Sequence, residues 1–153
     1  MGIDALCAEE GFVPRRVRDA KGWSIGYGHF LRPGESHSEL TEPQARELLA
    51  LDIRWAEHCV GALVRVPLRQ CQYDALVSLV YNIGAGRFGR SILLSRINAH
   101  AAAGIRKEWS EFRLSSVLVS PPGVVPERFE TRVDARLVAR RARELAMYFS
   151  GGE

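Results

Sequence analysis

The stretch EEGFVPRRVRDAKGWSIGYGH, at residues 9–29, decides how the N-terminal part of this chain folds. Apolar residues at helical spacing precede it and predict a short helix over residues 3–10 that ends at Gly11. Inside the stretch, apolar and polar side chains alternate and glycines interrupt the pattern, which predicts a β-hairpin or a small three-stranded sheet over residues 14–29. One carboxylate, Glu10, therefore stands at a helix end, and another, Asp19, stands at the first strand or turn.

Two carboxylates placed in this way suit the hydrolysis of a glycosidic bond. That reaction needs one protonated acid for the leaving oxygen and one ionised carboxylate on the other side of the sugar. A carboxyl at a helix end among apolar neighbours tends to keep its proton, whereas one in a polar turn stays ionised. The spacing alone fits equally a surface charge at Glu10 and a turn former at Asp19, so both interpretations remain open at this point.

The rest of the chain is predicted to be mostly helical. Residues 41–44 (Thr-Glu-Pro-Gln) carry the start signals of a long helix that runs to about residue 62. A buried helix follows Pro67 and stops at the glycines 84 and 86. Further helices are predicted over residues 91–102, 105–112 and 133–149, and a loop rich in proline over residues 115–126.

Composition limits the class of protein. The 153 residues, of which 46% are hydrophobic, suit a single globular domain. Three cysteines without regular spacing argue against a disulfide framework and a zinc site, so no metal is expected. Hydrolysis by two carboxylates and water would need no cofactor. The chain shows no secretory signal and no apolar run long enough for a membrane span, so we expect cytoplasmic synthesis and no stable membrane insertion.

The net charge of +3 is unevenly distributed, because residues 1–86 are net acidic and residues 87–153 are net basic. A basic half can attract nucleic acid, a bacterial cell wall or a membrane surface. The arginine-rich last helix lacks interleaved aromatic residues, and the chain lacks a groove-reading motif. Nucleic acid is therefore not expected as a partner.

Residues 9–29 resemble the active-site segment of the phage lysozymes (glycoside hydrolase family 24, endolysins or muramidases). That family has a Glu-Gly pair, an Asp nine residues after the Glu, and then Thr-Ile-Gly-Tyr-Gly-His. Glu10-Gly11, Asp19 and the run Ser24–His29 occupy these positions here, with Ser in place of Thr. The similarity continues at residues 40–49, 81–94, 109–112 and 137–145, and so covers nearly the whole chain.

The resemblance implies an α+β fold that is mostly α, namely the lysozyme-like fold of two lobes with a small antiparallel sheet. Residues 1–40 would form the N-terminal lobe with the catalytic residues, residues 41–62 the interlobe helix, and residues 63–153 a helical C-terminal lobe. All of them would belong to one lysozyme domain.

The resemblance also implies a role for each matching residue. Glu10 would protonate the glycosidic oxygen, Asp19 would stabilise the oxocarbenium-like state and help place the attacking water, and Ser24 would orient that water. An inverting mechanism would place the two carboxyl groups about 6.5–9.5 Å apart. His29 also fits a structural role, and Tyr81 also fits a simple core position. The expected contacts to the glycan are Gly28, His29, Tyr81 and Asn82.

Two segments depart from the family's pattern. Five residues separate Asp19 from Ser24, where the family usually has six, so the turn between them is shorter by one. Serine also lacks the methyl group that stiffens the threonine rotamer. Residues 113–128 match poorly and are expected to form a lengthened loop.

The implied function is hydrolysis of the β-1,4 bond between N-acetylmuramic acid and N-acetylglucosamine in peptidoglycan, for host cell lysis by a bacteriophage. Such enzymes commonly need a holin for release from the host cytoplasm to the wall, and they are monomers. The alternatives are a lytic transglycosylase and a non-catalytic, glycan-binding lysozyme-fold module of a virion. The basic side chains expected to aid docking to the anionic wall, one of them reaching toward Glu10, are Arg136, Arg140, Arg141 and Arg143.

Overall fold

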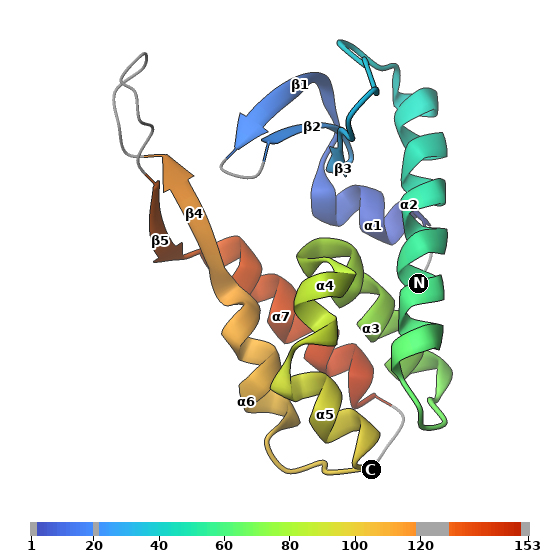
Figure 1. The fold of residues 1–153 in the computed structure, drawn as a ribbon, viewed down its shortest axis with the longest axis vertical. Helices are drawn as coiled ribbons and strands as arrows, with labels where there is room; N and C mark the ends of the chain where they lie inside the picture. Colours follow the sequence, from blue (N-terminus) through green and yellow to red (C-terminus); the bar gives the residue numbers. More distant parts are fainter. Residues whose placement is uncertain (1–2, 20–21, 119–128, 151–153) are drawn as a thin grey trace. The chain divides into compact units, whose positions relative to one another are not determined.

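The computed structural model describes residues 3–19, 22–118 and 129–150 (Figure 1). Their contacts divide the chain into two compact units. We call the described part of residues 2–51 and 114–134 the sheet unit. The described part of residues 52–113 and 135–153 is the helical unit.

The sheet unit begins with the helix and the sheet that the sequence predicts. Helix α1 (Ile3–Glu10) ends at Gly11, which has a φ of +71° and donates its N–H to the carbonyl of Cys7 at 3.0 Å. Strands β1 (Val13–Asp19), β2 (Gly22–Gly26) and β3 (His29–Phe30) then form an antiparallel sheet in the order β1-β2-β3. The predicted helix over residues 3–10 and the predicted small sheet are both confirmed.

Helix α2 (Glu42–Leu63) covers the buried side of this sheet with its first turns. Gly26 has a φ of +68°, and a Cβ atom there would lie 3.0 Å from the Cβ of Ala45, so β2 and α2 meet at a very close approach. The Tyr27 hydroxyl donates to Glu42 Oε1 at 2.9 Å and ties the strand end to the same helix. The predicted start is confirmed in part, because Gln44 accepts the Thr41 backbone N–H at 2.9 Å.

A second, two-stranded sheet replaces part of the predicted loop. Strand β4 (Leu114–Leu118) pairs antiparallel with β5 (Phe129–Val133) in an unbroken register from Leu114–Val133 to Leu118–Phe129. The expectation of a loop over residues 115–126 is therefore wrong for residues 115–118, and residues 119–126 lie outside the described part.

The helical unit consists of short helices around one buried helix. Trp109 and Phe88 are fully buried, and so are most side chains of residues 75–80, so the buried helix that the sequence predicts is confirmed. The last helix packs along it (Figure 1) and begins two residues later than expected, because Val133 still belongs to β5. The elements are α3 (Gln70–Ile83), α4 (Ala85–Gly89), α5 (Ile92–Asn98), α6 (Ile105–Ser110), the 3-10 turn η1 (Glu111–Arg113) and α7 (Ala135–Tyr148).

The described residues bear on disulfides, membrane-spanning helices and metal sites. Cys7, Cys59 and Cys71 are free and half-buried. Within residues 3–19, 22–118 and 129–150, no helix combines the length and the apolar character that crossing a membrane requires. In the same ranges, no three His, Cys, Asp or Glu side chains come together as a metal site would require.

Candidate active site

Glu10 and Asp19 flank the first strand of the sheet unit. Glu10 is the last residue of α1 and is half-buried. Asp19 is the last residue of β1, and its backbone pairs with Gly22 at the closed end of the β1–β2 hairpin. The side chain of Asp19 and residues 20–21 lie outside the described part, so the expected separation of the two carboxyl groups stays a prediction.

Ser24 stands in the middle of a row that crosses all three strands. Val17 on β1 and Phe30 on β3 are both paired with Ser24 on β2, so the three side chains share one face of the sheet. Val17 is 48% exposed and Phe30 is 46% exposed. The half-buried Ser24 hydroxyl therefore lies between two exposed apolar side chains on an open face of the sheet.

Glycine is required under the ring of Phe30. Gly22 has a φ of +141°, and a Cβ atom at this position would lie 2.8 Å from Cζ of Phe30. The far end of the ring thus lies close to the backbone at the start of β2. Sequence reasoning missed Phe30, because its position opposite Ser24 depends on the strand register, which only the structure shows.

His29 lies on the opposite face of the sheet from Ser24. It pairs with Ile25, is 5% exposed, and its Nε2 lies 3.2 Å from Glu35 Oε2. Glu35 also accepts the backbone N–H of Arg32 at 2.7 Å, and this bond, helped by His29, holds the pKa of Glu35 below its usual value. His29 therefore anchors the loop after β3. The structure does not bring His29 together with Ser24, whereas Gly28, with a φ of +87°, forms the exposed turn before β3.

Tyr81 and Asn82 occupy the last turn of α3 in the helical unit, and both are half-buried. Asn82 Oδ1 accepts a hydrogen bond of 2.9 Å from Nη2 of Arg141 on α7. Since a guanidinium only donates, the carbonyl side of the Asn82 amide must face Arg141. The NH₂ side forms no hydrogen bond with any described residue, and it is not buried.

Arg141 belongs to a buried polar cluster between α3, α6 and α7. Glu144 is its centre: Oε1 accepts from Ser78 Oγ at 2.8 Å, from Arg140 Nε at 3.1 Å and from Arg141 Nη2 at 3.1 Å. The second oxygen of Glu144 accepts from the indole N–H of Trp109 at 3.0 Å. The position of Asn82 is thus fixed, through Arg141, by side chains far away in the sequence.

This cluster corrects the expectation for the basic last helix. Arg140 and Arg141 are 5% and 2% exposed and point into the helical unit, so they are not part of a solvated surface for docking to an anionic wall. Both form ion pairs with Glu144, which is equally buried. Arg136 and Arg143 are the exposed members of the predicted set.

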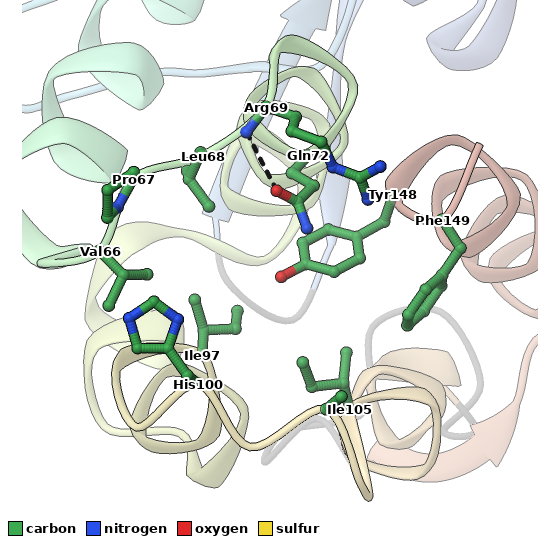
Figure 2. A pocket seen from close by; sticks show the side chains of 11 residues that line it. Val66, Pro67, Leu68, Arg69, Gln72, Ile97, His100, Ile105, Tyr148 and Phe149 are labelled. Carbon is green, nitrogen blue, oxygen red and sulfur yellow. Dashed lines mark hydrogen bonds between the residues drawn. The ribbon is translucent and has the colours of Figure 1, made fainter. Parts of the chain in front are cut away.

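A separate cavity of about 470 Å³ lies within the helical unit (Figure 2). None of the residues predicted for the site lines it. Its walls come from the segment before α3, the start of α3, the region between α5 and α6, and the end of α7. It is therefore a feature in addition to the candidate active site.

Known proteins that resemble this chain agree on its family. The phage lysozyme family model matches residues 7–144. The chain belongs to the phage lysozyme family. The endolysin of Salmonella phage P22 is 41% identical to it over 102 residues, which cover 63% of this chain and 70% of that relative. The endolysin of Bacillus phage PZA is 31% identical over 153 residues, which cover 98% of this chain and 54% of that relative.

Solved structures support the same fold. The muramidase domain of SpmX from Asticaccaulis excentricus superposes with a TM-score of 0.75 at 30% identity, covering 95% of this chain and 92% of that one. The endolysin of Escherichia coli O157:H7 phage FAHEc1 superposes with a TM-score of 0.73 at 27% identity, covering 98% and 91%. The mostly helical, lysozyme-like fold with small antiparallel sheets is thus confirmed, and this phage lysozyme is a glycosidase that hydrolyses peptidoglycan.

Proposed function

We propose that this phage lysozyme cleaves the β-1,4 bond between N-acetylmuramic acid and N-acetylglucosamine by an inverting hydrolysis. The observation that carries the proposal is the placement of Glu10 at the end of α1 and of Asp19 at the closed end of the β1–β2 hairpin, with Ser24 on the adjoining strand. Glu10 and Asp19 stand at the family's spacing, and Ser24 follows one residue earlier than the family's threonine.

The reaction would use Glu10 as the general acid and Asp19 as the ionised partner. Glu10 donates its proton to the glycosidic oxygen as the bond to the leaving sugar breaks. Asp19 stabilises the positive charge that develops at the anomeric carbon and accepts a proton from the attacking water. The water oxygen then forms the new bond on the face opposite to the leaving group, which inverts the configuration.

Ser24 would orient the water from the exposed face of the sheet. Its hydroxyl can accept one hydrogen bond from the water and donate another. The neighbouring Phe30 and Val17 offer apolar surface on which the C–H face of a sugar ring can rest. Phe30 therefore joins Gly28 and Tyr81 as a proposed contact of the glycan, while His29 supports the loop after β3.

Asn82 would recognise an acetamido group of the glycan. Arg141 occupies its carbonyl oxygen, so the group that it presents outward is the NH₂ donor pair. The amide carbonyl is the strongest neutral acceptor on an N-acetylated sugar, and both sugars of peptidoglycan carry one. Arg141 is thus proposed as a positioning residue, because it fixes the amide in the orientation that donates.

The proposal includes how the enzyme reaches its substrate. We infer that the protein is made in the host cytoplasm, acts as a monomer, and meets the cell wall once a holin has opened the inner membrane, as the family resemblance implies. It needs no cofactor, since two carboxylates and water suffice for the chemistry.

The products of digestion test the reaction type. Purified peptidoglycan treated with this enzyme should yield muropeptides with N-acetylmuramic acid at the reducing end. Proton NMR early in the reaction should show this reducing end as the α anomer. A β anomer would contradict inversion. Anhydro-muramic acid in the mass spectrum would instead establish the lytic transglycosylase, which uses a hydroxyl of the substrate in place of water.

A further inference from the structure

The cavity in the helical unit has the form of a binding site. Its volume of about 470 Å³ falls in the range typical of small-molecule pockets. Most of its wall is apolar, and the polar side chains at its surface are few, as in pockets that bind a specific ligand. The apolar walls are Val66, Pro67, Leu68, Ile97, Ala102, Ile105 and Phe149, and the polar side chains are Arg69, Gln72, His100 and Tyr148.

Tyr148 points its hydroxyl group into this cavity (Figure 2). The residue is only 4% exposed, and its ring is held edge-on by Trp109 at 5.2 Å and by Phe149 at 5.1 Å. Its hydroxyl forms no hydrogen bond with any described residue. Burial raises the pKa of this phenol, so it stays protonated and acts as a donor. A donor that packed rings hold in place, and that has no acceptor among the described residues, is placed for an acceptor on a ligand.

Gln72 also turns a donor toward the cavity. Its Oε1 accepts the backbone N–H of Arg69 at 3.0 Å, at the first turn of α3 (Figure 2). Because that bond consumes the carbonyl side of the amide, the NH₂ side is left for the cavity. The dipole at the start of this 14-residue helix adds partial positive charge at the same end.

Arg69 supplies a full positive charge beside these donors. It is half-buried and forms no ion pair with a carboxylate of the described residues. Its charge acts on Tyr148 and opposes the effect of burial on that pKa, so the guanidinium and the phenol share one environment. A guanidinium prefers a carboxylate, which it can bind through two parallel hydrogen bonds.

We propose that this cavity binds the carboxyl end of a peptidoglycan stem peptide. The terminal carboxylate pairs with Arg69, the preceding peptide carbonyl accepts from Tyr148 or Gln72, and the small alanine side chains rest on the apolar wall. A monoanion matches a single guanidinium, whereas a phosphate dianion would keep one charge without compensation. Stem peptides that end in D-alanine have this combination of one carboxylate, an adjacent carbonyl and two methyl groups. The site does not depend on which glycosidic bond is cleaved.

A titration with N-acetyl-D-alanyl-D-alanine, followed by NMR of the backbone amides of residues 97–105 and 148–149, tests the site. The acid should give saturable shifts there, and its C-terminal amide should bind at least about tenfold more weakly, because it lacks the charge. Hexanoate, which has the carboxylate but no peptide carbonyl, should bind more weakly than the dipeptide. Absence of saturable shifts, or equal binding of acid and amide, overturns the proposal.

Two variants and one control assign the binding to this cavity. Arg69→Gln should lower the affinity for the D,D-dipeptide by at least about tenfold. Tyr148→Phe, which keeps the packed ring, should lower it by about three- to tenfold. Tyr73→Phe removes a half-buried phenol of α3 that does not line the cavity, and should leave the affinity unchanged. Unchanged affinity in both cavity variants, at an unchanged Tm, contradicts the site.

The stereochemistry of the probe identifies the source of the peptide. A wall stem peptide ends in D-residues, whereas a protein ends in an L-residue. N-acetyl-L-alanyl-L-alanine is therefore expected to bind more weakly than the D,D-dipeptide. Equal or tighter binding of the L,L-dipeptide would contradict a wall peptide as the occupant.

Discussion

At the scale of the single residue, Asn82 uses its two amide atoms for different purposes. The oxygen is engaged by Arg141 inside the protein, and the nitrogen is left for what lies outside. Asn98 differs, because both of its amide atoms bind protein groups: Oδ1 accepts from Arg65 N, and Nδ2 donates to the Leu63 carbonyl. The two asparagines therefore offer a matched pair for the same substitution.

Asn82→Asp should leave Tm unchanged or raise it, because a carboxylate accepts a stronger hydrogen bond from Arg141. KM for N-acetylated glycan should rise about tenfold, since the outward donors become acceptors. With de-N-acetylated glycan the same substitution should cause no additional loss. Asn98→Asp should lower Tm and leave KM unchanged. An unchanged KM in Asn82→Asp would contradict the acetamido contact.

Glu35 should make stability depend on acidity. Its pKa is lower in the folded protein than in the unfolded chain, mainly because it accepts the Arg32 N–H. Its contribution is therefore present above the unfolded pKa and is lost as the pH falls through the folded pKa. Glu35→Gln should lower Tm at pH 7 and have a smaller effect near pH 3. A loss of Tm that is equal at both pH values would contradict this linkage.

At the scale of the element, the packing of α3 against α7 depends on one buried carboxylate. Glu144 forms ion pairs with Arg140 and Arg141. It also accepts hydrogen bonds from the Ser78 hydroxyl and the Trp109 indole N–H. Burying two guanidinium groups without it is strongly unfavourable. The same carboxylate also holds Arg141 in position for Asn82, so the stability of the helical unit and the geometry of the site are coupled.

Glu144→Ala should destabilise the protein by about 3–5 kcal/mol in denaturant unfolding, because both buried arginines lose the carboxylate with which they pair. Glu111→Ala removes an exposed partner of Arg113, a pair with 3.7 Å between its charged atoms, and should change stability by at most about 1 kcal/mol. Similar, small effects of the two substitutions would show that the cluster is less important than its burial suggests.

At the scale of the whole molecule, local patterns predicted the elements well and non-local contacts poorly. Apolar residues at helical spacing identified α2 (residues 42–63) and α3 (residues 70–83). The alternation of apolar and polar residues around Ile25 identified the three-stranded sheet. The β4–β5 hairpin was missed because its prolines indicated a loop.

The sequence predicted the motif residues of the candidate site but not the contacts that surround them. A motif with fixed offsets predicted Glu10, Asp19 and Ser24 because their spacing is local. The burial of Arg140 and Arg141 was not predictable, since arginine on an amphipathic helix usually faces water and its partners Ser78 and Asn82 lie on another helix. The row formed by Val17, Ser24 and Phe30 required the strand register, which the sequence does not specify.

The rate at which purified peptidoglycan releases reducing ends, compared between Glu10→Gln and Glu9→Gln, tests the central claim most directly. Glu9 is the adjacent carboxylate on α1 and controls for charge and for helix stability. We predict that Glu10→Gln lowers kcat by about 10²–10⁴-fold at an unchanged Tm, because the leaving oxygen loses its general acid, and that Glu9→Gln stays within about threefold of the parent enzyme. Activity retained in Glu10→Gln, or an equal loss in both variants, would contradict the assignment of Glu10 as the catalytic acid.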